Sequence, residues 1–306
     1  MGVRSRPRRA VQHRRGPGDV PGGDPGGPGD VPQPDPGDPH PHAGRVARVD
    51  AGIDPGAGGQ RRDTWRSTMS FDAHEFINGM VKELEASGRG LPDAEIVRKI
   101  AAGEATKAEM VGWARQHYHG VTYHTRRFLS ALVPRLPFEL TAVVVENLAE
   151  EVLGTASGTG RSHLDLLFQF VEYLDYPREV VTEAEPNPDA VLSASWLLVL
   201  GYHRPWYEMF AGANLAIEYQ IPPSYTRMVE GFRKHYGFSE HGIEFFTVHI
   251  AADEEHGGET IAEIFQQYAT TEEIRRALRS AFFTGAEATR RCWDAYRGIP
   301  ETPSGA

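Results

Sequence analysis

The sequence predicts an all-α protein, folded as one helical bundle of about eight to ten helices. From Phe71 onward, apolar residues recur at spacings of three and four, as Phe76, Met80, Val81 and Leu84 do. Prolines fall between such segments, at positions where helices start or stop. The strict alternation of apolar and polar residues that is typical of strands is almost absent. These observations favour helices packed on helices.

Each expected helix is a stretch of this periodicity between two breaks. In chain order, the expected helices span about 71–87, 93–103, 106–132, 136–153, 162–177, 188–201, 204–220, 223–236, 240–268 and 271–297. The β-branched run from Val143 to Val145 sits in a helical register with Leu140 and Leu148, so we assign it to a helix. The two prolines that follow Ile221 divide one long helical region into two.

The two ends of the chain differ from this bundle, which we place at 69–298. Residues 1–68 hold eleven arginines, eight aspartates and half of the 22 prolines. Such a segment has too few large apolar residues to bury a core, so we expect a disordered extension, possibly upstream of a true start at Met69. Residues 299–306 are expected to form a flexible tail.

The charge and composition exclude several classes of protein. The extension carries a net +3 and the whole chain −10, which leaves −13 on residues 69–306. An acidic domain is a poor partner for nucleic acid, which needs clustered lysines and arginines. No run of 18 apolar residues exists to span a membrane, and the single cysteine, Cys292, excludes an internal disulfide. A cytoplasmic protein is therefore expected.

One segment near the C-terminus contains candidate metal ligands. His249, Asp253 and His256 stand at positions i, i+4 and i+7, which fall on one face of a helix. Two imidazoles and a carboxylate then project to the same side. Nitrogen and oxygen donors of this kind, with open positions left over, suit iron that reacts with oxygen. A solvated helix face is the simpler alternative for this set.

Two other segments could meet that face. A helix is expected to end at Gly154, and the next helix opens near His163, so the hairpin could bring a carboxylate beside this histidine. Glu150 and Glu151 compete for the role, because adjacent helix residues point about 100° apart. Glu218 follows a run of small apolar residues and precedes a helix break, where an isolated carboxylate needs a partner.

The pattern of these residues along the chain resembles that of the haem-oxygenase-like di-iron oxidases and oxygenases. The resemblance covers roughly residues 105–270, and it rests on three elements in order: Asn147-Leu-Ala-Glu-Glu151 with Gly154 and His163, then Glu218 with Pro222, then His249-x3-Asp253-x2-His256. It implies six metal ligands: Glu151, His163, Glu218, His249, Asp253 and His256. The loop after Glu151 is one or two residues longer than the family pattern, which leaves Glu150 open as the alternative.

The resemblance also implies a function. Two Fe(II) ions would react with O2 as co-substrate, in an enzyme of specialised metabolism that acts on a small molecule. N-oxygenation of a small amine or amino-acid-like substrate is the reaction we favour. Desaturation, C–C cleavage or decarboxylation of an amino or fatty acid is the alternative. An external electron donor and a homodimer are expected partners, and no catalytic residue is assigned beyond the ligands.

The sequence also allows other ligands and other functions. His117, His119 and His124 are interpreted as ordinary helix residues, with His124 as the best additional candidate ligand. A metal-free enzyme or a binding protein of the same fold is also compatible with the helical pattern. The hydrolases of this fold would need an active-site cysteine, and Cys292 lies far from the three motif segments.

Overall fold

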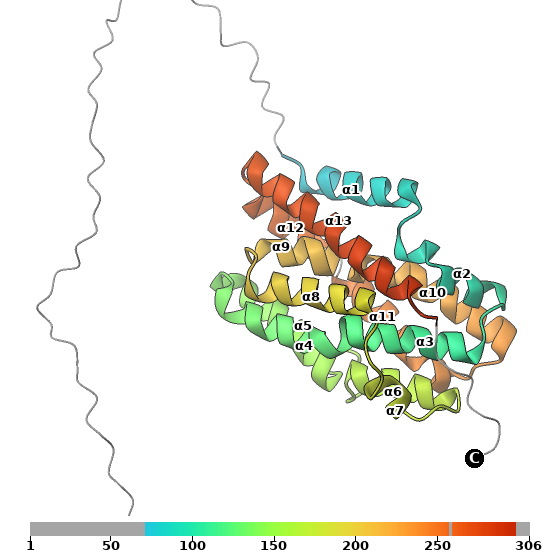
Figure 1. Ribbon diagram of the computed structural model, residues 1–306. Helices are drawn as coiled ribbons and strands as arrows, with labels where there is room; N and C mark the ends of the chain where they lie inside the picture. The colour runs from blue at the N-terminus through green and yellow to red at the C-terminus, as the bar shows by residue number, and fades with distance from the viewer. Residues whose placement is uncertain (1–70, 257–258, 298–306) are drawn as a thin grey trace, which may run out of the picture. The chain divides into compact units, whose positions relative to one another are not determined.

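The computed structural model describes residues 71–256 and 259–297, with the side chains of 252–256 left out. Helices make up the regular structure of this described part, and no strand occurs in it (Figure 1). The α-helices are α1 (Ala73–Ser87), α2 (Glu95–Ala102), α3 (Lys107–His117), α4 (Tyr123–Leu132), α5 (Thr141–Leu153), α6 (His163–Tyr173), α7 (Glu179–Thr182), α8 (Pro188–Tyr202), α9 (Tyr207–Met209), α10 (Ile221–Gly231), α11 (Glu240–His256), α12 (Glu259–Tyr268) and α13 (Glu272–Asp294). The all-α prediction is confirmed. The predictions for 1–68 and 299–306 lie outside the described residues.

Two of the expected helices are interrupted by π-helical turns. The segment expected as one helix over 106–132 is divided into α3 and α4 by the turn η2 (Tyr118–Thr122), and the segment expected over 204–220 contains η5 (Phe210–Leu215). A π-helical turn holds one more residue than an α-helical turn, so it changes which side chains share a face. Hydrophobic periodicity does not reveal such an insertion. Both turns line the cavity described below.

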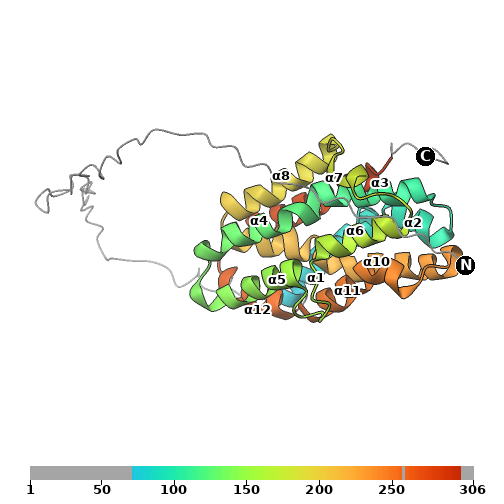
Figure 2. The ribbon, with the colours of Figure 1, turned by 90° about the horizontal axis from the view of Figure 1, so that it is seen from below.

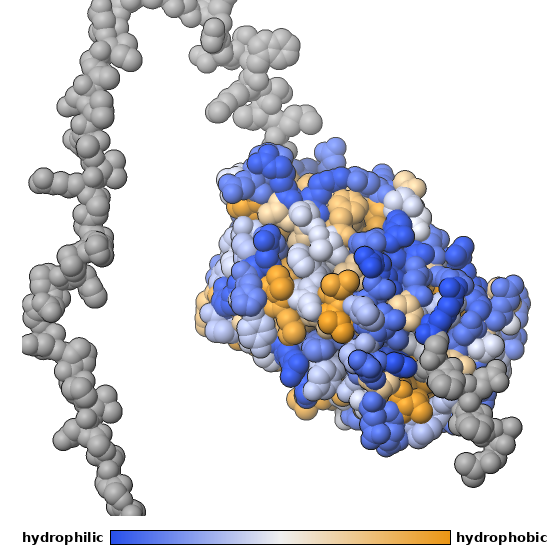
Figure 3. Space-filling model, viewed as in Figure 1, coloured by the Kyte–Doolittle hydropathy of each residue, from blue (hydrophilic) through white to orange (hydrophobic). Residues whose placement is uncertain are grey.

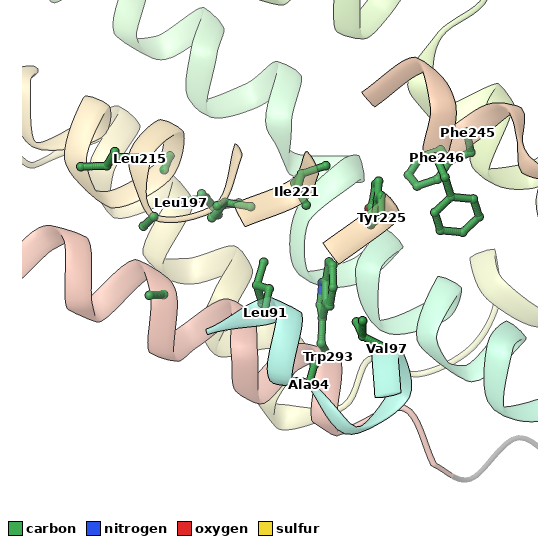
Figure 4. Close-up of a cluster of buried hydrophobic side chains, with 14 of the residues drawn as sticks. Leu91, Ala94, Val97, Leu197, Leu215, Ile221, Tyr225, Phe245, Phe246 and Trp293 are labelled. Carbon is green, nitrogen blue, oxygen red and sulfur yellow. The ribbon is translucent and has the colours of Figure 1, made fainter. Parts of the chain in front are cut away.

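The core forms where α10 and α11 pack against each other and α10 also packs against α2, while α8 packs against α4 and α13 (Figures 1 and 2). Large aromatic side chains fill this core, and Trp113, Tyr225, Phe246 and Trp293 have no measurable exposure. Figure 4 shows Tyr225 on α10 between Trp293 of α13 and the two phenylalanines of α11. Burial of side chains this large stabilises the arrangement of helices around the site.

Two glycines allow α13 to approach η5 closely. A Cβ atom placed on Gly285 would lie 2.0 Å from the carbonyl oxygen of Gly212, so no larger residue fits without movement of the backbone. The contact sets the position of η5, which leads directly to Glu218. The two glycines are therefore a structural condition for the placement of that carboxylate.

The surface over α8 is apolar. Figure 3 shows apolar patches over this helix, on which Val191 and Leu192 are exposed. A groove between α8 and α13 is lined by Trp196, Phe283 and Arg291 among others. None of the candidate ligands whose side chains the structure describes lines this groove. Within the described part of the chain, no helix is long and apolar enough to cross a membrane.

Candidate metal centre

The α5–α6 hairpin positions the first candidate ligands. Helix α5 ends at Gly154, whose φ of 59° is in the left-handed region that favours glycine, and its N–H donates to the Glu150 carbonyl over 2.8 Å. Helix α6 begins at His163, and the Ser162 side chain caps it by accepting a hydrogen bond from the N–H of Asp165. The last turn of α5 and the first turn of α6 therefore face each other (Figure 2).

Glu150 turns toward the loop of this hairpin. Its Oε2 accepts hydrogen bonds from the N–H groups of Ala156 and Ser157, at 2.6 and 3.1 Å. Its Oε1 lies 3.2 Å from Nε2 of His163. Only 4% of Glu150 is exposed, and burial would raise its pKa, but the hydrogen bonds from Ser157, His163 and Ala156 hold that pKa below its usual range. Both carboxylate oxygens of Glu150 are thus occupied, one by the N–H groups of the loop and one by Nε2 of His163.

Glu151 lies on the other side of the same imidazole. Its Oε1 is 3.1 Å from Nδ1 of His163, but Nδ1 has no hydrogen-bond partner among the described residues, because the two groups are not aligned for one. A buried nitrogen close to a carboxylate without a hydrogen bond is what a pair of ligands that converge on one ion would show. A histidine ligand usually donates its other N–H to a carboxylate, which is the position of Glu150. The geometry favours Glu151 over Glu150 as the ligand.

His249, from α11, completes a group of three. Its Nδ1–H donates to the backbone carbonyl of Phe245 over 2.7 Å, which leaves Nε2 for a metal. The rings of His163 and His249 have centroids 4.1 Å apart. One ligand atom each from Glu151, His163 and His249 lies within 4.8 Å of the others, so one ion could contact all three. The donor set of two imidazoles and a carboxylate fits iron.

Burial and charge set the protonation of these groups. Burial would lower the pKa of His163, but the negative charge of Glu151 and the contact with Glu150 raise it to about 9. Burial would raise the pKa of Glu151, but His163 and His249 hold it below its usual range. Burial, with the charge of His163, lowers the pKa of His249 to about 3. A neutral His249 and a charged Glu151 are ready to bind a cation, while His163 must first release a proton.

Glu218 lines the same cavity as Glu151 and His249. It follows η5, at the start of the short turn η6 (Glu218–Gln220), and its two carboxylate oxygens accept hydrogen bonds from Asn147 and Asn214, at 3.3 and 2.6 Å. The two amides hold the carboxylate in one orientation. This arrangement joins α5 to η5, so the first and second segments of the predicted site are brought together.

Asp253 and His256 are placed only by their backbone. Both residues belong to α11, four and seven positions after His249, as expected. Their side chains lie outside the described residues, and so do Gly257 and Gly258. Their roles as ligands stay predictions, and the same holds for the complete set of six.

Three of the candidate ligands, Glu151, Glu218 and His249, line one cavity of about 50 Å³, and His163 adjoins it through its contact with Glu151. That volume can hold ions and a few waters. Its polar lining consists of His117, Glu151, Glu218, Tyr225 and His249 together with two threonines. The remaining wall is apolar and consists of Val121, Phe128, Leu197, Ala213, Ile217 and Ile221. The lining therefore combines polar groups, three of them candidate ligands, with an apolar wall that limits the access of water.

His117 is a cavity residue that the sequence did not single out. Its Nδ1 accepts a hydrogen bond from the Trp293 indole N–H over 3.2 Å, and its Nε2 lies 3.4 Å from the Tyr225 hydroxyl. An indole only donates, so Nδ1 carries no proton and Nε2–H points to Tyr225. Burial, with the charge of His249, lowers the pKa of His117 to about 3, so the ring is neutral.

His117 belongs to α3 and its ring lines the cavity, so its interpretation as a helix residue rather than a ligand stays a prediction. Nε2–H of His119 donates to the Val181 carbonyl over 2.9 Å, and His119 does not line the cavity. His124, the additional candidate, does not line the cavity either, and its Nδ1 is buried without a partner among the described residues. The π-helical turn η2 separates these histidines from the face that a continuous helix would give them.

Comparison with protein families finds one match. A family described as iron-containing redox enzyme matches residues 111–290, more than half of the chain. A 4-aminobenzoate synthase from Chlamydia pneumoniae is 27% identical over 173 residues, which cover 54% of this chain and 71% of that protein. Residues 111–290, which the family matches, contain the three motif segments.

Solved structures show the same fold at low sequence identity. A protein with a haem oxygenase-like fold from Shewanella denitrificans OS217 is 16% identical, with a TM-score of 0.60 over 74% of this chain and 92% of that one. A TenA homologue from Pseudomonas syringae pv. tomato DC3000 is 12% identical, with a TM-score of 0.62 over 72% of this chain and 92% of that one. A CadD-like protein from Nostoc punctiforme is 19% identical, with a TM-score of 0.55 over 72% and 96%. The haem-oxygenase-like fold is confirmed.

Proposed function

The chain belongs to the iron-containing redox enzyme family, and from this premise we propose that it is a non-haem di-iron oxygenase that transfers oxygen from O2 to the nitrogen of a small amine or amino-acid-like substrate. The observation that carries the proposal is the His163 ring, held by Glu150 on one side while its other nitrogen converges with Glu151 and His249. That convergence is the local geometry of a metal ligand.

Six residues of this chain would hold two ferrous ions. Glu151, His163 and His249 form one cluster, and Glu218 faces the same cavity. Asp253 and His256 follow His249 on α11 at the spacing that the site requires. When bound, the two ions would supply the electrons that reduce O2.

The protein itself contributes orientation and exclusion of water. Glu150 holds the proton on Nε2 of His163, so that Nδ1 is the ligand atom. The amides of Asn147 and Asn214 hold Glu218 in place, and the apolar wall keeps bulk water from the cavity. His117 holds its proton on Nε2 toward Tyr225, whose hydroxyl faces the cavity. Tyr225 thus presents a hydroxyl that can hold or pass a proton at the site.

The lack of a basic residue in the lining favours an amine over a fatty acid. No lysine or arginine lines the cavity among the described residues, so the carboxylate of a fatty acid would find no basic side chain to pair with there. The relative from Chlamydia pneumoniae is named for 4-aminobenzoate, which carries an amino group. Transfer of one oxygen atom to an amine needs O2, two electrons and two protons, and gives a hydroxylamine and water.

The experiment that tests this proposal is a turnover assay. The protein is loaded with Fe(II) without oxygen, mixed with O2 and a reductant, and given a panel of small amines and amino acids. We expect iron-dependent consumption of O2 and a product that has gained oxygen on nitrogen. Loss of two hydrogens or of a carbon fragment instead would favour the carbon-centred alternative. No iron-dependent consumption of O2 with any substrate would contradict the proposal.

A matched pair of variants controls this assay. Glu151→Gln removes a charged ligand and is expected to abolish the consumption of O2. His241→Ala changes an exposed histidine two turns earlier on the same helix as His249, and is expected to leave it unchanged. Equal activity in the two variants would show that the reaction does not depend on this cluster.

A further inference from the structure

A second hollow adjoins the metal cavity on its outer side. It has a volume of about 150 Å³, and residues at the start of α4, the end of α5 and the start of α6 line it. Its lining consists of Thr122, Tyr123, Arg126, Glu151, Val152, Ser162 and Leu164. Thr122 and Glu151 line both spaces. The candidate ligand Glu151 therefore separates the inner cavity from the hollow.

We propose that this hollow is the mouth of the metal cavity and that Arg126 binds the carboxylate of a small amino acid there. The amino end of the same molecule then points inward, past Thr122 and Glu151. This inference rests on the proposed function and narrows its substrate class from amines in general to amines that carry a carboxylate.

The charges in the hollow set this orientation. The acidic residue of the lining is Glu151, which the hollow shares with the inner cavity. Arg126 is exposed, and it is the basic residue of the lining. The start of α6, marked by Ser162 and Leu164, adds the positive end of a helix dipole. A zwitterion is therefore favoured in one direction only.

Arg126 is available for such a contact. Its guanidinium lies over the Tyr123 ring at 5.4 Å, which holds the side chain beside the hollow. Within the described part of the chain, no carboxylate forms an ion pair with it. Arg127 lies over the same ring at 5.2 Å but does not line the hollow. The two arginines are thus both exposed and both contact the Tyr123 ring, but only Arg126 lines the hollow.

The size of the hollow limits the ligand. Sites for drug-sized molecules measure roughly 300–1,000 Å³, which is well above this hollow and the inner cavity. A long fatty acid does not fit this space. A short amino acid, with its two charged ends separated by a few carbons, matches both the volume and the polarity.

The test compares probes that differ only in the carboxylate. Binding of 4-aminobutanoate and of the uncharged 4-aminobutanamide is measured by calorimetry on the Fe(II)-loaded protein without oxygen, and by saturation-transfer NMR on the metal-free protein. β-Alanine and its amide form a shorter pair. We expect each acid to bind about tenfold or more tightly than its amide. In Arg126→Gln the advantage of the acid is expected to disappear, and in Arg127→Gln it is expected to remain.

A second pair of variants tests the hollow without a change of charge. Val152→Trp fills the hollow and is expected to abolish binding of both acid and amide. Leu153→Trp places the same ring on the exposed neighbour outside the lining, and is expected to bind both probes normally. Binding that survives in Val152→Trp would overturn the proposal.

The proposal would also be overturned if both arginine variants lost the preference for the acid equally, or if neither lost it. No binding of any acid probe at millimolar concentration would overturn it as well. The iron content of each sample is measured in parallel. Binding to the metal-free protein that depends on Arg126, in protein that takes up no iron, would support the hollow as a carboxylate site and contradict the proposed di-iron function.

Discussion

Nδ1 of His163 lies 3.1 Å from Oε1 of Glu151 but makes no hydrogen bond with it, although this nitrogen is buried. Two polar groups this close in a protein interior normally align. The opposite nitrogen of the same ring faces Glu150, which also binds two N–H groups of the loop. The two adjacent glutamates therefore have different tasks: Glu151 faces the metal cavity, and Glu150 orients the histidine.

This division of tasks predicts different effects for two conservative substitutions. Glu151→Gln removes a ligand and is expected to lower the number of irons bound per chain. Glu150→Gln keeps the ligands but weakens the support of His163, so we expect unchanged stoichiometry with affinity reduced roughly 10–100-fold. Titration of the metal-free proteins with Fe(II) under anaerobic conditions measures both quantities. The reverse pattern would identify Glu150 as the ligand.

The raised pKa of His163 predicts that metal binding releases protons. In the metal-free protein this ring is protonated at pH 7, because its pKa is about 9. A metal at Nδ1 displaces that proton, so binding should strengthen as pH rises toward 9. Calorimetry in buffers of different ionisation enthalpy is expected to show release of at least about one proton per chain at pH 7. Binding without proton release would mean that Nδ1 of His163 is not a ligand atom.

The same group affects the stability of the metal-free fold. Because the folded pKa of about 9 exceeds the unfolded value of 6.5, its contribution is complete below pH 6.5 and is lost as pH rises through 9. Thermal unfolding of metal-free protein between pH 6.5 and 9 should therefore show a declining midpoint. Glu151→Gln is expected to reduce this decline, since it removes the main source of the raised pKa.

The contact of Asn214 with Glu218 predicts a selective loss of metal. Asn214→Leu keeps a similar volume but removes the amide that donates to Glu218 over 2.6 Å. We expect the cluster of Glu151, His163 and His249 to retain its metal, while occupancy on the Glu218 side falls. Iron content should move from near two per chain toward one. Full occupancy in this variant would show that Asn147 and the other surroundings of Glu218 suffice.

The lowered pKa of His117 predicts an effect on acid stability. Its folded pKa is about 3 and its unfolded value 6.5, so between these values the unfolded chain takes up a proton that the folded chain does not. The free energy of unfolding should therefore fall as pH falls below 6.5, by up to about 1.4 kcal/mol per pH unit for this one group. His117→Asn keeps an acceptor for the Trp293 indole but removes the titration.

Urea unfolding of the metal-free proteins at several pH values from 4 to 7 measures this slope. We expect the slope of His117→Asn to be shallower than that of the wild type. His241→Asn, at an exposed position, should leave it unchanged. An identical slope in all three proteins would show that His117 is already protonated in the folded state.

Much of the fold could be predicted from the sequence, because helical periodicity and proline breaks are local signals. The expected helix over 188–201 agrees with α8 to within one residue, and that over 71–87 agrees with α1 to within two. The segment over 106–132 was harder, because a π-helical turn inside it leaves no trace in hydrophobic spacing. The short α7, Glu179–Thr182, was not expected at all, since a single turn has too few residues to show a period.

Part of the candidate site could also be predicted from the sequence, and part could not. The spacing on α11 and the order of Glu151, His163 and Glu218 could be taken from the sequence. The choice between Glu150 and Glu151 could not, because it depends on which carboxylate the N–H groups of the loop capture. That the ring of His117 lines the cavity could not be predicted, for a related reason. Its position at the cavity depends on Trp293, which is 176 residues away and carries no motif.

Iron content of protein loaded with Fe(II) under anaerobic conditions, with excess metal removed, tests the central claim most directly. We expect near two irons per chain in the wild type and in His241→Ala, with a marked loss in His249→Ala. Helical content measured by circular dichroism should be the same in all three. Wild-type protein that is folded but retains no iron, or His249→Ala that retains as much as wild type, would contradict the assignment of this cavity as a metal centre.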